Sequence, residues 1–309
     1  MTLPHAHGSF AQLPADRTLI MGILNVTPDS FSDGGLYQDA AAAVAHAREL
    51  VAQGADIIDV GGESTRSGAV RVDLAEEQRR VLPVIEALAA ENIVMSVDTL
   101  NPETARAAVA AGAQIINDVA GMNLRDDMVE TVAELGVPYI LMHARGTSQT
   151  MDSQAVYADV AGEVFRELFA LRERLLAGGV APEQIILDPG PGFAKQGEQN
   201  WQILAGVRSL AQDGHRVLVA GSRKRFIAQL LREQDAAARG VAWEQVEERP
   251  ARGRDVASAA LSLMAAQAGA WAVRVHDVRA TADALAVQEA WLAHDQGRSP
   301  KVTDRPVRS

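Results

Sequence analysis

The hydrophobic pattern of the chain repeats one unit: an amphipathic stretch, a glycine, and then a short apolar run. The apolar runs lie at 19–26, 55–60, 93–98, 114–118, 138–143, 184–188, 216–221 and 271–276. They are rich in β-branched residues and do not alternate with polar ones, which is typical of parallel strands buried on both faces. Eight strands alternating with helices over about 275 residues predict an α/β fold, a single-domain (β/α)8 TIM barrel. A doubly wound open sheet is the structural alternative.

The stretches between the runs carry signals of helix ends. Glycines precede five of the runs at positions where helix C-caps belong: Gly54, Gly112, Gly136, Gly214 and Gly269. Asp73 and Glu76 have the spacing of a capping box, and Asn101 directly precedes Pro102, as an N-cap precedes a proline in the first helical turn. Asp39 is expected to cap the helix that ends near Gly54. Helices are therefore predicted between successive strands.

Several segments fall outside the repeated unit. Residues 1–17 form a polar leader without the basic and apolar regions of a secretory signal, and residues 295–309 are expected to be disordered. The barrel domain is then 18–294. The charged segment 232–254 is expected to be a solvated excursion between two helices. The uncharged stretch 256–273 contains serine, glutamine and glycine, so we expect a buried helix and strand there, with no membrane span and a cytoplasmic location.

Composition narrows the function. The chain has 309 residues, of which 48% are hydrophobic and 22% charged, as in folded globular proteins. It has no cysteine, which excludes a disulfide scaffold, a thiolate metal site and a cysteine nucleophile. The formal net charge of −11 argues against binding nucleic acid. An anionic small molecule is still compatible, because a local basic pocket can exist on an acidic protein.

Polar residues occur where each predicted strand ends. They are Asn25, Asp59, Asp98, Asn117, Asp118, His143, Asp188, Ser222, Arg223, Lys224, Arg274 and His276. In a barrel these ends converge on one face, where barrel enzymes have their active sites. For Asp59 and Asp118 we favour a structural role, the orientation of loop backbone or of a neighbouring arginine.

The chemistry of these residues divides the expected site in two. Donors and cations from 222–224, Arg274 and His276 follow the last two strands, a common phosphate-binding sector of such barrels. Acceptors and an amide, Asp98, Asn117 and Asp188, suit a flat heterocycle with several N–H donors. Mg²⁺ is the expected metal because it needs few protein ligands, and Asn25 is a plausible one. The loops 27–35 and 61–68 are expected to act as lids.

Eight segments carry more specific motifs in chain order. They are MGILNVTPDSFSDGG (21–35), GADIIDVGGESTRSGA (54–69), SVDT (96–99), AQIINDVAG (113–121), LMH (141–143), ILDPGPGFAK (186–195), GSRKRFI (221–227) and RVHDV (274–278). Together they resemble the dihydropteroate synthase family, from about residue 19 to residue 293.

The resemblance implies a transferase of folate biosynthesis on a TIM barrel. Such an enzyme joins 6-hydroxymethyl-7,8-dihydropterin diphosphate to 4-aminobenzoate, releases diphosphate with Mg²⁺, and is a sulfonamide target. It implies pterin binding by Asp98, Asn117 and Asp188, with Lys224 beyond the ring. Further implied contacts are Arg274 stacking on the ring, Met142 beneath it, and Asn25, Arg274 and His276 at the diphosphate and Mg²⁺. Val275 belongs to the same RVH segment.

The resemblance also assigns the second substrate and the catalytic set. Thr65, Arg66, Ser67, Phe193 and Ser222 would surround the aminobenzoate, and Phe31 and Asp33 would close over the leaving group. The implied catalytic residues are Lys224, Arg274, His276, Asp98 and Asp33, with early departure of diphosphate favoured over in-line displacement. Ser67 stands where the family's STRPG motif has proline. This departure predicts lower sulfonamide affinity.

Two other functions and one assembly state are considered. A pterin-binding methyltransferase domain would share the barrel and the acidic strand ends, although it would not need the SRK and RVH segments. A non-catalytic pterin-binding paralogue would be expected to lack loop residues or Lys224, which this chain retains. A homodimer is implied by the resemblance.

Overall fold

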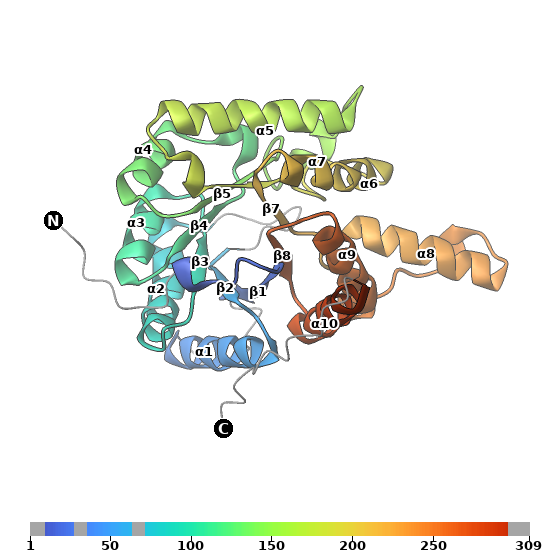
Figure 1. The fold of residues 1–309 in the computed structure, drawn as a ribbon, viewed down its shortest axis with the longest axis horizontal. Coiled ribbons are helices and arrows are strands. Elements are labelled where there is room, and N and C mark those ends of the chain that lie inside the picture. Colours follow the sequence, from blue (N-terminus) through green and yellow to red (C-terminus); the bar gives the residue numbers. More distant parts are fainter. Residues whose placement is uncertain (1–9, 28–35, 64–71, 296–309) are drawn as a thin grey trace.

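The eight predicted strands form a closed parallel barrel with helices around its outside (Figure 1). The computed structural model describes residues 10–27, 36–63 and 72–295. The strands are β1 (Leu19–Asn25), β2 (Ile57–Gly61), β3 (Met95–Asp98), β4 (Ile115–Asp118), β5 (Tyr139–Met142), β6 (Ile185–Asp188), β7 (Arg216–Val219) and β8 (Ala272–Val275). Seven of them lie within their predicted runs, and β2 ends one residue beyond its run, at Gly61. β1 pairs with β8, which closes the sheet and excludes the open-sheet alternative.

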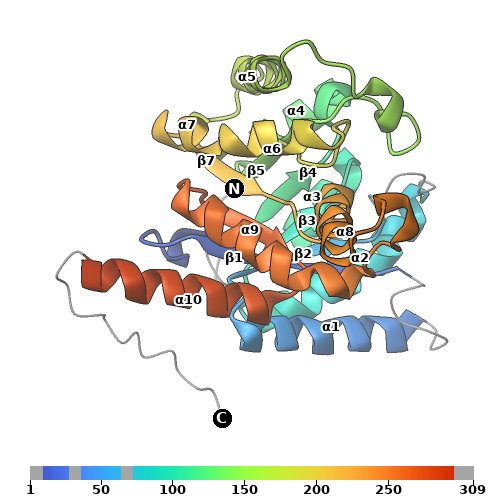
Figure 2. The same ribbon diagram turned by 90° about the vertical axis from the view of Figure 1, so that its right-hand side faces the viewer.

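Helices connect the strands and cover the outer face of the barrel (Figures 1 and 2). They are α1 (Leu36–Gln53), α2 (Leu74–Ala90), α3 (Pro102–Ala111), α4 (Asp126–Leu135), α5 (Val160–Ala177), α6 (Glu198–Ala205), α7 (Val207–Gln212), α8 (Arg225–Arg239), α9 (Asp255–Gln267) and α10 (Val278–Asp295). The stretch 256–273 contains α9 and reaches β8, as predicted. In the described part of the chain, no helix combines the length and the apolar character needed to cross a membrane.

The predicted helix ends are mostly confirmed. Gly112 and Gly136 are left-handed C-caps with φ of 118° and 67°. Asp73 caps α2 by accepting a 2.9 Å hydrogen bond from the Glu76 backbone. The Glu76 carboxylate, however, binds two arginines of its own helix, because α2 places them one turn further on. The expected cap at Asp39 is wrong, since α1 begins three residues earlier, at Leu36.

The core consists of two layers separated by the strands. Inside the barrel, an apolar cluster fills its amino-terminal half: Leu19, Met21, Ile57, Ile115, Ile140, Ile186, Leu218 and Ala272. A larger cluster lies between strands and helices and includes Ile20, Ile58 and Ile116. Because side chains alternate along a strand, positions two residues beyond the inner cluster also point inward. At the carboxyl ends four of those inward positions carry polar groups: Asp59, Asn117, Asp188 and Arg274.

The amino-terminal end of the barrel is closed by residues before β1. Phe10 and Leu13 pack against the inner cluster, and the ring centroids of Phe10 and Trp271 are 5.9 Å apart. Arg17 forms two hydrogen bonds to the Asp56 carboxylate, of 2.6 and 2.8 Å. The described part of the predicted leader therefore covers the end of the barrel opposite the polar strand ends.

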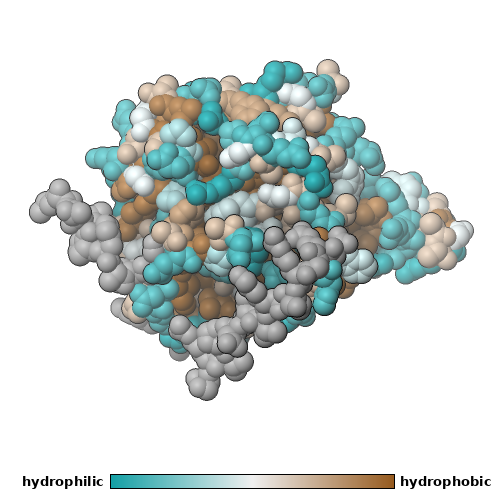
Figure 3. Space-filling model, in the orientation of Figure 1, coloured by the Kyte–Doolittle hydropathy of each residue, from teal (hydrophilic) through white to brown (hydrophobic). Residues whose placement is uncertain are grey.

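The charged segment 232–254 is mostly exposed, as expected, but it begins inside a helix and not after one. Its first half continues α8 to Arg239, and the remainder folds back on that helix. Arg249 binds Asp235 with bonds of 2.8 and 2.5 Å, and Arg232 donates to the Val246 carbonyl at 2.5 Å. Hydrophilic and hydrophobic residues are intermixed on the face that Figure 3 shows, and the surface of α8 is mixed in the same way. The segment is thus an ordered structure, because its arginines find carboxylate and carbonyl partners on its own turns.

Candidate active site

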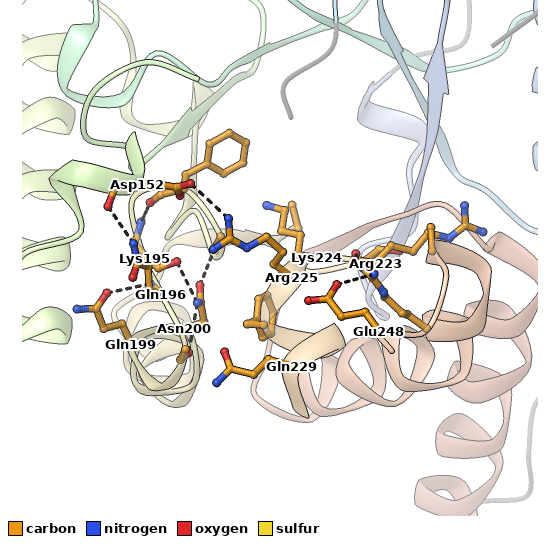
Figure 4. A pocket seen from close by; sticks show the side chains of 18 of the residues that line it. Asp152, Lys195, Gln196, Gln199, Asn200, Arg223, Lys224, Arg225, Gln229 and Glu248 are labelled. Atoms are coloured by element: carbon orange, nitrogen blue, oxygen red, sulfur yellow. Dashed lines mark hydrogen bonds and ion pairs between the residues drawn. The ribbon is translucent and has the colours of Figure 1, made fainter. Parts of the chain in front are cut away.

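A cavity of about 1070 Å³ opens where the strands end. Its lining includes six of the residues proposed from sequence: Asn25, Phe193, Ser222, Lys224, Arg274 and His276. Residues of the loop after β6 form one wall and residues of the loop after β7 face them, as Figure 4 shows for Lys195 and Lys224. The strand ends thus bring together residues that are more than 200 positions apart in the sequence, such as Asn25 and Arg274.

Arg274 and two carboxylates form the centre of the site. Its Nε donates to Asp59 at 2.6 Å and its second guanidinium nitrogen to Asp98 at 3.0 Å. The Asn117 amide donates to both Asp59 oxygens at 3.2 and 3.3 Å. Burial and the nearby Asp59 raise the pKa of Asp98 to about 8, although Arg274 opposes this. A ligand that places a hydrogen-bond donor beside Asp98 would replace the water that this carboxylate has lost on burial.

The two aspartates expected to be structural have that role. Asp59 is fully buried and orients Arg274, and it also accepts a 2.5 Å bond from Ser96. Asp118 faces the opposite way, because it is one residue beyond the inward-pointing Asn117. It accepts from the Ala120 backbone at 2.7 Å and from the Tyr139 hydroxyl at 2.6 Å. Both predictions are confirmed.

Asp188 and Lys224 flank the loop that follows β6. Asp188 accepts a 2.7 Å bond from the Gly190 backbone, and burial raises the pKa of its carboxyl. The Lys224 ammonium donates to the Pro191 carbonyl at 2.5 Å and lies 4.3 Å from the centre of the Phe193 ring. Burial lowers the pKa of Lys224 to about 7, although Asp188 opposes this. Near neutral pH the Lys224 amine is therefore present in both its protonated and its neutral form.

The last two strands supply a second polar group. The Ser222 hydroxyl is 3.1 Å from His276 Nδ1 and accepts from the His276 backbone at 3.3 Å. Arg223 was expected among the cations here, but its guanidinium binds Asp255 with bonds of 2.5 and 2.8 Å. Its backbone has a φ of 61°, the left-handed region, within the turn between β7 and α8. The charge of Arg223 is therefore neutralised by α9.

Other predicted residues have different placements. Met142 is buried and points into the barrel, two residues beyond the inward Ile140. Val275 packs in the outer core layer, so only its backbone could meet a ligand. The remaining residues, Phe31, Asp33, Thr65, Arg66 and Ser67, lie outside the described residues.

His143 and Lys195 form a group that sequence reasoning assigned differently or missed. His143 was expected at the mouth, but its ring is fully buried, 2.9 Å from the Lys195 ammonium and 2.9 Å from Glu167. Burial and Lys195 lower the pKa of His143 to about 3. Lys195 is 5% exposed. The available signal was its position at the end of the DPGPGFAK segment, in a chain with three lysines.

The structure permits a limited test of the expected Mg²⁺ site. The described residues contain no group of three or more histidines, aspartates or glutamates placed to hold a metal ion. Asn25 points inward and lines the cavity near Arg274 and His276. One amide oxygen suits a Mg²⁺ ion that keeps its waters and binds a diphosphate, since this ion dehydrates reluctantly. The residues present fit such an ion.

The comparisons with known proteins agree with this site. The family described as pterin binding enzyme matches residues 21–276. Dihydropteroate synthase of Mycobacterium leprae is 47% identical over 274 residues, which cover 88% of this chain and 93% of the relative. The structure of Xanthomonas albilineans dihydropteroate synthase with 4-aminobenzoic acid has a TM-score of 0.79 and 44% identity, covering 90% of this chain and 94% of that one.

A second structure of the Xanthomonas albilineans enzyme is in complex with 7,8-dihydropteroate. It has a TM-score of 0.77 and 42% identity, and covers 91% of this chain and 96% of that one. Fold, strand-end polar residues and family match define a pterin-binding barrel enzyme. Within that class, the chain belongs to the dihydropteroate synthase family.

Proposed function

We propose that this protein condenses 6-hydroxymethyl-7,8-dihydropterin diphosphate with 4-aminobenzoate to give 7,8-dihydropteroate and diphosphate. The observation that carries the proposal is the division of the site: buried acceptors at Asp98, Asn117 and Asp188, and cations or donors at Lys224, Arg274 and His276. The first set suits the N–H donors of a pterin, and the second suits a diphosphate. The relatives that match almost the whole chain are dihydropteroate synthases.

The buried carboxylates would hold the pterin. An ionised carboxylate can accept two hydrogen bonds from adjacent N–H groups, and such bonds are strengthened by the charge. Asp98 and Asp188 have raised pKa values because burial removes their water, so a donor-rich ring that replaces this water favours their ionised forms. Asn117 offers both an acceptor and a donor. Lys224 lies on the side of the cavity from which it would reach the ring.

The opposite side would hold the leaving group. Arg274 and His276 line the cavity and present nitrogen atoms to a diphosphate. Asn25, with waters and diphosphate oxygens, would hold Mg²⁺, which supplies positive charge to the departing group. Arg274 is oriented by Asp59 before substrate arrives, so little reorganisation is needed during the reaction.

The transfer breaks one bond and forms one bond. The C–O bond between the pterin methylene and diphosphate breaks, and both bonding electrons leave with the diphosphate. The methylene then bonds to the aniline nitrogen, which loses a proton to solvent. Asp98 and Asp188 supply negative charge that stabilises the cationic methylene. Phe193 and Ser222 line the cavity where aminobenzoate would bind, and Thr65, Arg66, Ser67 and Asp33 would complete the enclosure.

The proposal includes a homodimer in the cytoplasm. Helices α9 and α10 pack side by side and carry exposed apolar side chains, with Met264 65% exposed, Val287 65% and Trp291 74%. Large apolar side chains exposed on neighbouring helices favour association with another protein surface. A second copy of the chain would cover them. The cytoplasm is proposed because a diphosphate-bearing substrate does not cross membranes unaided.

The test is reconstitution with purified protein. We expect that the protein, Mg²⁺, dihydropterin diphosphate and 4-aminobenzoate yield dihydropteroate and diphosphate in equal amounts. Omission of 4-aminobenzoate is the control for simple hydrolysis. Pterin binding without product would contradict the proposal and favour a non-catalytic paralogue. Transfer of a methyl group from a reduced folate would favour a methyltransferase domain.

A further inference from the structure

Lys195 is a buried cation to which the proposed reaction gives no task. Its Nζ contacts four acceptors: the Phe193 carbonyl at 2.8 Å, His143 Nδ1 at 2.9 Å, the Gly190 carbonyl at 3.0 Å and the His143 carbonyl at 3.3 Å. An ammonium group has three donor protons for such a set, and a neutral amine has two. Burial lowers the pKa of the Lys195 amine well below its usual value, but the four acceptors favour the ammonium form. The bonds fix this group between two strand-end loops, after β5 and after β6.

The loop that Lys195 holds has an unusual backbone. Gly190, Gly192 and Ala194 have φ values of 65°, 82° and 51°, all in the left-handed region. For Ala194, which has a Cβ, this conformation costs roughly 1 kcal/mol. A segment of this kind persists only when its surroundings determine it. Lys195 supplies two of those determinants by binding the carbonyls of Gly190 and Phe193.

The other determinant comes from α6. Asn200 accepts a bond from the Gly192 backbone at 2.6 Å and donates to the Lys195 carbonyl at 3.2 Å. Its side chain is buried. The loop is therefore fixed by hydrogen bonds to two side chains, the Lys195 ammonium and the Asn200 amide. Figure 4 shows Lys195 and Asn200 together on the wall that faces Lys224.

This loop positions the reacting end of the cavity. Two carbonyls lie between those that Lys195 binds, and one of them, of Pro191, accepts the 2.5 Å bond from Lys224. The Phe193 ring is the aromatic group against which the Lys224 ammonium rests. Gly192 is also in close contact, since a Cβ there would lie 2.7 Å from Lys224 Cδ. The place of Lys224 thus depends on this loop.

Lys195 is connected through His143 to a chain of hydrogen-bonded side chains. With Nδ1 accepting from Lys195, the hydrogen-bond network assigns the His143 proton to Nε2, which donates to Glu167 at 2.9 Å. Arg145 binds Glu167 at 3.0 Å and Glu163 at 2.9 Å. The His143 ring is therefore held in one orientation by α5, and Lys195 is tied through it to the barrel wall.

We propose that Lys195 is a positioning residue for the transfer: through the carbonyls of Gly190 and Phe193 it fixes the loop that holds Lys224 beside the pterin and the Phe193 ring beside the second substrate. This inference rests on the proposed function. It concerns the part of the cavity that this loop lines, whereas the diphosphate side is built on β1, β7 and β8. Loss of Lys195 should therefore weaken the binding of both substrates.

The test compares Lys195→Met with Tyr139→Phe and wild type. Methionine keeps the length of the side chain and removes its donors. Tyr139→Phe is a matched control, because it removes a buried hydrogen bond, to Asp118, on the outer side of the same barrel. For Lys195→Met we expect the KM for each substrate to rise about tenfold and kcat to fall, because the loop carries Phe193 beside one substrate and holds Lys224 beside the other. Tyr139→Phe should leave both KM values within about twofold.

A second readout does not depend on activity. Amide hydrogen exchange over residues 189–194 should become at least about tenfold faster in Lys195→Met and stay unchanged in Tyr139→Phe. If Lys195→Met does not fold, Lys195→Gln is used with the same expectations. Unchanged KM values, or unchanged exchange in the loop, would overturn the proposal. If wild type makes no dihydropteroate, the proposed function fails, and the exchange measurement still decides whether Lys195 fixes the loop.

Discussion

Arg274 donates its Nε–H to the carboxylate of Asp59 at 2.6 Å, and Asp59 has no exposed surface. A fully buried carboxylate has exchanged its water for protein donors, here Arg274, Ser96 and Asn117. Asp59 therefore belongs to the support of the site, and Arg274 is the group presented to the ligand. The Arg274 side chain lines the cavity in the orientation in which it binds Asp59.

We expect Asp59→Asn to reduce kcat by about tenfold or more, equivalent to roughly 1.4 kcal/mol of transition-state stabilisation. Asparagine keeps the shape and can still accept a bond, but it leaves Arg274 with a weaker partner. Steady-state kinetics check this. Asp118→Asn is the matched control, since Asp118 is equally buried and faces away from the cavity. Similar losses of kcat in both variants would refute the assignment.

The low pKa of Lys224 can be measured directly. The chain has three lysines, and Lys195 is 5% exposed and should remain unlabelled. Because burial lowers the pKa of Lys224 to about 7, its labelling by an amine reagent should rise with a midpoint near that pH. Lysine in a short model peptide, labelled in parallel, titrates at about 10.4 and serves as the reference. Mass spectrometry reads each site separately.

Bound pterin should change this titration. Dihydropterin diphosphate would bring Asp188 and Asp98 into their ionised forms beside Lys224, which favours the ammonium. Labelling at pH 7.5 should therefore slow when the substrate is added and recover when it is removed. A midpoint near that of an ordinary lysine in the free protein, or no protection by substrate, would show that Lys224 is not buried beside the pterin.

The sequence predicted the strands and their polar ends because both depend on local pattern. A run buried on two faces and a polar residue after it can be recognised without tertiary structure. Which of two neighbouring residues faces inward cannot be recognised in this way. Asn117 points into the barrel and Asp118 points out because closure fixes the register of β4 against β3 and β5. The structural role of Asp118 could be inferred, and its partner Tyr139 could not.

The departures have non-local causes. Arg223 follows β7 as expected, but its partner Asp255 is 32 residues away, after a segment that sequence alone described as solvated. His143 follows β5, yet Lys195, 52 residues later, draws it into the interior. In both cases a polar side chain was assigned to the site because of its position on a strand end. Arg223 lines the cavity, but its guanidinium is paired with Asp255, and His143 is buried beside Lys195. Both contacts depend on how distant segments pack.

His143 should make the protein sensitive to acid. Its folded pKa of about 3 is below the usual 6.5, so the folded state keeps the ring neutral while the unfolded chain binds a proton. The unfolded state thus binds more protons between pH 6.5 and 3, and this contribution to stability is lost as the pH falls through that window. The slope is about 1.4 kcal/mol per pH unit.

His143→Gln isolates this effect, because other carboxylates also titrate at low pH. Urea unfolding of wild type and variant should be compared at several pH values from 7.5 to 4.5. The variant should be less stable than wild type at pH 7.5, where the Lys195 bond is weakened. The difference should narrow as the pH falls below 6.5. Parallel stability curves would mean that His143 does not stay neutral in the folded protein.

The exposed apolar face of α9 and α10 leads to a prediction about assembly. Trp291 is 74% exposed and lines a surface groove with Val287 and Ala290. A side chain of this size left in water forfeits roughly 2–3 kcal/mol of burial energy, which a second copy of the chain would recover.

We expect sedimentation to give a dimer for wild type and a monomer for Trp291→Glu combined with Met264→Glu. Val256→Glu, on the same helix as Met264 and 83% exposed, tests how far the interface extends toward the start of α9. Because the cavity lies at the strand ends and none of these three apolar residues lines it, the monomeric variant should keep its KM for both substrates within about threefold. A wild type that sediments as a monomer at all concentrations would contradict the proposed homodimer.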